Sequence, residues 1–193
     1  YNSMVFNTTG YENTAVGSGA LYANTTAANN TAVGRLALRF NTTASNNTAV
    51  GYQSLYANTT GGNNTALGNL ALANNTTVNA STAVGSQALF SHTSGGRNDA
   101  FGAFSLFSTT TGTDNVGIGS NALFSNTTGQ YNIAVGRQAL NSNTTASENT
   151  AVGYQAGYSN TTGASLTAVG YQALKANTGG NNTAVGRAAS DAN

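Results

Sequence analysis

A glycine that follows Ala-Val, or a close variant of it, returns at a fixed interval along this chain. The step between successive glycines is 17 residues, except for the last step, which is 16. A fixed period of this kind marks a repeat architecture, in which each unit packs only against its neighbours. The marker glycines are Gly17, Gly34, Gly51, Gly68, Gly85, Gly102, Gly119, Gly136, Gly153, Gly170 and Gly186.

The repeat runs through the whole chain without a linker or a change of composition. Its consensus is N-T-A-V-G-x-x-A-L-x-x-N-T-T-G-x-N, and the shorter last unit has lost one residue within "KANTGG". A deletion of one residue in a surface turn is easily tolerated. We therefore expect residues 1–193 to form a single continuous repeat array and to be a segment of a longer fibrous protein.

The length and composition of the unit predict its fold. Helix-pair repeats need about 33 residues or more, and Gly, Asn and Thr are poor helix formers. Thr-Ala-Val is typical of a short strand, the Ala-Leu segment predicts a second one, and Asn-Thr-Thr-Gly predicts a turn. The sequence therefore predicts an all-β fold, a parallel β-solenoid (β-roll) of about eleven 17-residue coils stacked ~4.8 Å apart.

The variants of the strand suggest which side chains point inward. Val116 and Ile133 replace the usual Thr, two residues before the Val/Ile position. Because side chains alternate along a strand, we expect the Thr and Val columns to face the core and the Ala column to face a neighbouring chain. A column of rings beside the Leu column is either part of that interface or packs locally around a corner. These rings are Tyr22, Tyr56, Phe90, Phe107, Phe124 and Tyr158.

Composition excludes several classes of partner. Charged residues make up 6% of the chain, against a usual ~25%, and the net charge is +1. No basic stripe is present for nucleic acid, no apolar run approaches the ~18 residues of a membrane span, and no cysteine is present. So little charge favours self-association, and we expect identical chains as partners.

The motifs "NTAVG", "NVGIG" and "NIAVG" resemble the head repeats of trimeric autotransporter adhesins and similar repeats of phage and bacterial tail fibres. The resemblance covers every coil, at about six of seventeen positions. It implies a left-handed parallel β-roll in which three chains pack side by side. It also implies a trimer as the favoured homo-oligomer, with the Ala column facing the neighbouring chain. The longer period and the Asn-Thr-Thr turn depart from the family pattern.

Two Asn columns allow two interpretations. Stacked Asn amides can form a hydrogen-bonded ladder along the solenoid. Asn-Thr-Thr also satisfies the N-x-[ST] pattern of a glycan acceptor, and a laddered Asn cannot carry a sugar as well. The candidate acceptors are Asn7, Asn24, Asn41, Asn58, Asn75, Asn126, Asn143 and Asn160. Asn29, Asn46, Asn63 and Asn181 fit the pattern through Asn-Asn-Thr.

Catalytic chemistry is not indicated. The carboxylates are scattered, no triad, phosphate loop or metal cluster is present, and His92 is the only histidine. We expect no enzymatic activity, no cofactor and no metal. The least regular coils span residues 92–114, and recognition sites often interrupt a repeat. Arg97, Asp99 and Phe104 are the candidate binding residues there, with simple sequence drift as the alternative.

Three functions remain in view. The leading one is a structural shaft or filament segment of an extracellular appendage, on a cell or virion surface. The second is an adhesin or tail-fibre region that binds a host surface or glycan. The third is an ice-binding solenoid, which the placement of the paired Thr residues in turns disfavours.

Overall fold

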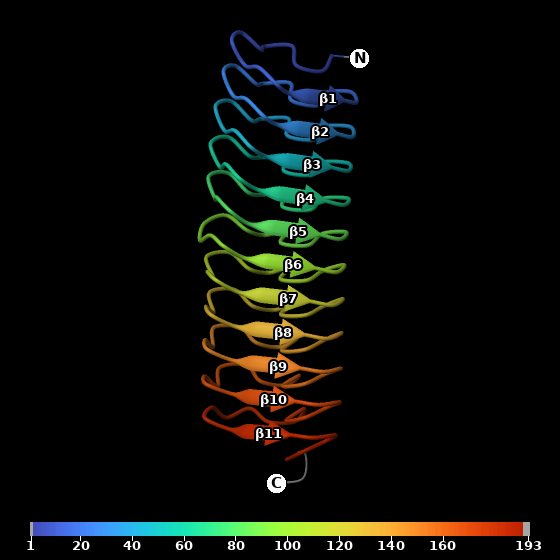
Figure 1. The fold of residues 1–193 in the computed structure, drawn as a ribbon. Helices are drawn as coiled ribbons and strands as arrows, with labels where there is room; N and C mark the ends of the chain where they lie inside the picture. The colour runs from blue at the N-terminus through green and yellow to red at the C-terminus, as the bar shows by residue number, and fades with distance from the viewer. Residues whose placement is uncertain (1, 191–193) are drawn as a thin grey trace.

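The computed structural model, described here for residues 2–190, is an all-β parallel solenoid (Figure 1). Eleven three-residue strands, one per coil, form a single sheet in the order of the sequence, and the described chain contains no helix. This confirms the predicted fold class. The strands are β1 (Thr14–Val16), β2 (Thr31–Val33), β3 (Thr48–Val50), β4 (Thr65–Leu67), β5 (Thr82–Val84), β6 (Asp99–Phe101), β7 (Val116–Ile118), β8 (Ile133–Val135), β9 (Thr150–Val152), β10 (Thr167–Val169) and β11 (Thr183–Val185).

Equivalent residues of successive coils lie side by side. All neighbouring strands pair in parallel, as when Thr14 pairs with Thr31 and Ala15 with Ala32. The 16-residue last unit keeps the register, because Thr167 pairs with Thr183. The missing residue is therefore absorbed outside the sheet, in the turn. Like side chains consequently stack on like along the whole molecule.

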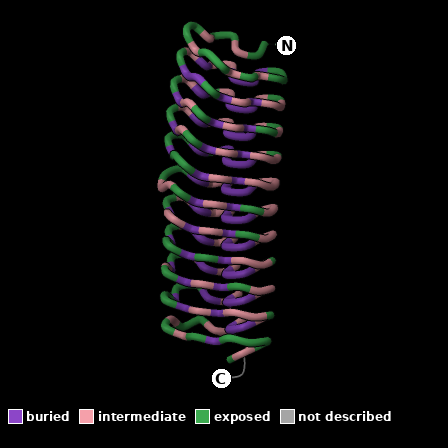
Figure 2. Tube along the Cα trace, in the orientation of Figure 1, coloured by how far each residue is buried: buried purple, intermediate pink, exposed green. Residues whose placement is uncertain are grey.

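The prediction that the Thr and Val columns face the core and the Ala column faces outward is wrong. The alanine in the middle of the strand points into the core, and Ala32, Ala49 and Ala66 are fully buried. The Val column lies on the outer face of the sheet, where Val50 is 38% exposed and Ile118 is 41% exposed. The coil is thin, so only a small side chain fits between the strand and the leucines opposite. Figure 2 shows, from β2 to β11, a buried residue in the middle of each strand between two accessible ones.

The Ala-Leu segment is not a second strand. In this segment every second residue has a positive φ, which a strand does not have. In one coil, for example, Gln53 has a φ of 54° and Leu55 a φ of 49°. The amide of Leu55 still donates to the Ala71 carbonyl of the next coil, at 3.0 Å. None of the non-glycine residues with positive φ is β-branched, because such side chains clash most in this conformation. This explains why the buried column is leucine and not valine or isoleucine.

The rings beside the Leu column pack locally, which decides between the two interpretations of that column. Phe90, Phe107 and Phe124 stack nearly parallel, with centroid separations of 5.4 and 5.2 Å. Tyr22 and Tyr56 make edge-to-face contacts with Phe6 and Phe40. All six rings are half-buried. They cover a corner of the coil and do not form an exposed strip.

A break in the Leu column is compensated from the next coil. Gly157 stands where leucine is usual, and the Cβ of an alanine there would lie 3.3 Å from the Leu166 side chain. Leu166 itself replaces a ladder asparagine and is fully buried. The Leu166 side chain therefore fills the space that the missing side chain at Gly157 would leave, as close packing of the interior requires.

The marker glycines are required by both conformation and space. We expect Gly85→Ala to lower the free energy of unfolding by about 3 kcal/mol or more. The φ of Gly85 is +136°, and an added Cβ would lie 2.6 Å from the Gly102 carbonyl group. The measurement is unfolding in urea, monitored by circular dichroism.

Gly186→Ala is the matched control. Its φ is +131°, but the nearest atom to an added Cβ lies 3.8 Å away, so strain remains and the clash does not. We expect Gly186→Ala to lower the free energy of unfolding clearly less than Gly85→Ala does. Equal effects of the two substitutions would contradict the close approach of neighbouring coils.

Candidate functional site

The turn asparagines form a ladder inside the solenoid. The Nδ2 of Asn41 donates to Asn24 Oδ1 at 3.2 Å and to the Ala44 carbonyl at 2.9 Å. Asn58 makes the same two contacts with Asn41 and Gly61, both at 2.9 Å. Asn24, Asn41, Asn58, Asn75, Asn126, Asn143 and Asn160 are all fully buried. Each amide is therefore held by the preceding coil, by its own turn, or by both.

This geometry argues against the eight candidate glycan acceptors. Seven are fully buried, and the eighth, Asn7, is half-buried and donates from Nδ2 to the Gly10 carbonyl at 2.9 Å. A glycan needs the same amide nitrogen, so it would have to replace the ladder. The Asn-Asn-Thr positions differ, because Asn29, Asn46, Asn63 and Asn181 are exposed on the other side of the turn.

The asparagines that precede the strands form a second ladder, as the ladder interpretation predicted. The backbone amide of Asn47 donates to Asn30 Oδ1 at 2.9 Å, and Asn64 repeats the contact with Asn47. The Nδ2 of Asn47 donates across the coil to the Gly61 carbonyl. Burial of these polar groups is tolerated because each finds partners in the neighbouring coils.

The structure does not bring the three candidate binding residues together. Asp99 begins β6 on the sheet, and Phe104 packs against the Phe107 ring at 5.9 Å. Arg97 lies on the turn side, where its Nε and Nη2 donate to the Asp114 carboxylate at 2.6 and 2.9 Å. The pair raises the pKa of Arg97 and lowers the pKa of Asp114. The two residues are 17 apart, so the period alone was sufficient to predict this pair.

His92 occupies a ladder position and interrupts the ladder. Its ring is fully buried, and its Nδ1 and the Thr109 hydroxyl of the next coil have no hydrogen-bond partner. Its Nε2 lies 3.4 Å from Asn98 Nδ2. Burial lowers the pKa of His92 to about 4, and the nearby backbone of Gly95 opposes this only partly. His92 occupies the turn Asn column of the repeat, which on sequence grounds is interpreted as a surface position. That interpretation is wrong, because this column points inward.

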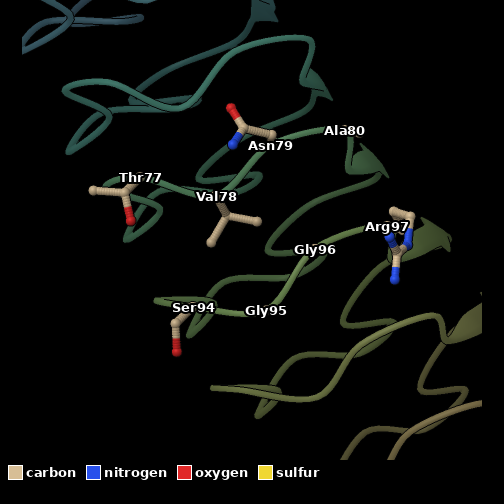
Figure 3. A pocket seen from close by; sticks show the side chains of 8 residues that line it. All are labelled: Thr77, Val78, Asn79, Ala80, Ser94, Gly95, Gly96 and Arg97. Atoms are coloured by element: carbon tan, nitrogen blue, oxygen red, sulfur yellow. The ribbon is translucent and has the colours of Figure 1, made fainter.

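A cleft of about 450 Å³ opens beside this interruption, between residues 77–80 and residues 94–97 (Figure 3). In regular coils three backbone amides of the turn side donate to carbonyl groups of an adjacent coil. Examples are the Ala57 amide, which donates to the Ala73 carbonyl, and the Thr59 amide, which donates to the Thr76 carbonyl. The equivalent amides here are those of Asn74, Thr76 and Arg97, and they make no such bond. The strands β5 and β6 remain paired, so the coils separate only on the turn side.

The outer face of the sheet carries a continuous apolar strip, here called the outer strip. It is the third residue of every strand, and it is aliphatic in ten coils and phenylalanine in one. Val16 is 58% exposed, Ile118 41% and Val185 71%. Phe101 is exposed in the middle of the strip. Contiguous apolar surface of this kind usually marks an interface.

Comparison with known proteins identifies no relative: no family model, no curated protein and no solved structure matches this chain. Within residues 2–190 no three His, Cys, Asp or Glu side chains gather where they could hold a metal ion. That same part of the chain has no helix with the length and hydrophobicity to cross a membrane. The outer strip and the cleft beside His92 are therefore the two features that call for a functional explanation.

The buried imidazole makes stability depend on pH. Because the pKa of His92 falls from 6.5 to about 4 on folding, the unfolded chain binds the proton more readily. The free energy of unfolding therefore has its full value above about pH 6.5. It falls by about 3 kcal/mol as the pH drops towards 4. Urea unfolding at about pH 7 and about pH 4.5 measures the difference.

His92→Asn is the matched variant, since asparagine is the regular residue of this column. We expect it to lose most of the pH dependence over this range. A variant with the same slope as the original chain would show that His92 is not held neutral in the core.

Proposed function

We propose that this chain is a structural shaft segment of an extracellular fibre, assembled side by side with identical chains, a trimer being the favoured state. The observation that carries the proposal is the outer strip, which runs the length of the sheet. The resemblance to adhesin heads and tail-fibre repeats supports it. A location on a cell or virion surface belongs to the same proposal.

The interface we propose is the outer strip and not the Ala column. The alanines are buried within the chain and cannot reach a neighbour. Valine, leucine, isoleucine and phenylalanine side chains, by contrast, present a flat row with one residue per coil. Burying each exposed side chain against a second chain is worth about 25 cal/mol per Å². Repetition over eleven coils makes a weak contact strong without any special residue.

Electrostatics supports close packing of chains. The chain has six Lys and Arg residues and five Asp and Glu residues, so like-charge repulsion between copies is small. Three arginines are also engaged with rings: Arg35 with Tyr52, Arg39 with Tyr22 and Arg187 with Tyr171. A long solenoid whose stability adds up coil by coil suits a shaft that must bear load over its length.

An ice-binding function receives less support from the same face. The threonine column of the strands would offer a regular array, but Asp99, Val116 and Ile133 interrupt it over three successive coils. In the turns, the first threonine of each pair is turned to the next coil, as when Thr42 Oγ1 donates to the Thr59 carbonyl at 3.1 Å. We therefore do not propose it.

A charge in the middle of the outer strip should separate the chains. We expect the original chain to form an oligomer in sedimentation velocity, and Ile118→Lys to weaken association by tenfold or more. The reason is that the lysine ammonium would lose its hydration within an apolar interface. Circular dichroism checks that the variant keeps its fold.

Thr128→Lys is the control, because Thr128 is exposed on the turn side of the same coil. It should leave the sedimentation of the oligomer unchanged. A chain that stays monomeric at about 100 µM, or an oligomer that tolerates Ile118→Lys, would overturn the proposed assembly.

A further inference from the structure

We propose that the cleft between residues 77–80 and 94–97 binds a neutral, hydroxyl-rich ligand, a saccharide unit. This inference goes beyond the shaft function and does not depend on it. The cleft faces the turn side of the solenoid, away from the outer strip, so a bound ligand and an assembled fibre are compatible.

The size and the location of the cleft favour a small ligand. A volume of about 450 Å³ lies within the range of roughly 300–1,000 Å³ that is usual for small-molecule sites. Gly95 and Gly96, which have no side chains, form part of the lining. The Val78 side chain points into the cleft and provides an apolar surface for one face of a sugar ring (Figure 3).

The hydrogen-bonding groups match hydroxyls. The Arg97 amide makes no backbone hydrogen bond, and the Asn79 carbonyl is not used by the next coil. The Asn79 side chain is turned away from the cleft, because its Oδ1 accepts from the Gly62 amide of the preceding coil at 2.6 Å, so Asn79 offers the ligand its backbone carbonyl alone (Figure 3). Thr77 adds a hydroxyl to the lining. Donors and acceptors are thus mixed over a few ångströms, and a hydroxyl can serve either.

The charges at the rim favour a neutral ligand over an anion. Arg97 is the cation of the cleft, but two of its guanidinium nitrogens are held by Asp114. An anion would have to approach that carboxylate as well. The ion pair fixes the guanidinium at the rim and leaves Nη1 as a donor, which suits an uncharged polar group.

The test is saturation-transfer NMR of the whole chain with four probes: the methyl glycosides of glucose, galactose, mannose and N-acetylglucosamine. We expect transfer to at least one of them, with a Kd on the order of millimolar. Gly96→Gln should weaken binding tenfold or more, because its side chain occupies the cleft. Arg97→Gln should weaken it several-fold through loss of a donor.

Ala164→Gln is the matched control, since Ala164 is exposed at the equivalent position in a coil pair that is closed. It should leave binding within twofold. Circular dichroism shows whether Gly96→Gln is folded, and Arg97→Gln tests the site independently of that. No transfer to any of the four probes would overturn the proposal, as would equal binding by Gly96→Gln. None of these results bears on assembly through the outer strip.

Discussion

The structure depends on hydrogen bonds between coils that must repeat in register. Each coil has neighbours only above and below, so the backbone can be satisfied only if every unit follows the same path. The marker glycines enforce this path, since their φ near +135° and the adjacent carbonyl leave no room for a Cβ. Once the register is fixed, each side chain meets its own equivalent. Asparagine ladders, stacked phenylalanines and a leucine column are all results of this single constraint.

The same constraint explains why the molecule is polar inside and apolar outside in places. A thin coil encloses little more than two alanines and a leucine, such as Ala66, Ala71 and Leu72. Asparagine can be buried beside them because the next coil supplies its partners. The valines cannot be accommodated inside and remain on the outer face. An isolated chain therefore leaves its largest strand side chains unpacked, which is why the outer strip has the most to gain from a second chain.

The period made most of the fold predictable, and the thinness of the coil limited the rest. Regular spacing of Gly17, Gly34 and Gly51 indicated stacked coils, and the trimmed turn near Thr178 proved harmless to the register. The prediction that side chains alternate between the two faces of the strand was also correct. Alternation alone could not show which of the two sets faces inward, because that depends on the width of the core. For the same reason the sequence did not show that Asn58, a candidate glycan acceptor, is buried. The cleft was not predictable, because a regular period cannot show that the backbone amides of Asn74, Thr76 and Arg97 lack their usual partners.

The central claim is that 17 residues advance the chain by one coil along a straight stack, and a distance measurement tests it most directly. Thr26 and Thr145 are exposed, lie at equivalent positions and are seven coils apart. The chain has no native cysteine, so both can be replaced by cysteine and spin-labelled without interference. With labelled chains diluted in unlabelled ones, pulsed dipolar spectroscopy should give a narrow distribution near ~34 Å, seven times the spacing between coils. A broad distribution, or a maximum beyond ~50 Å, would contradict the stacked solenoid.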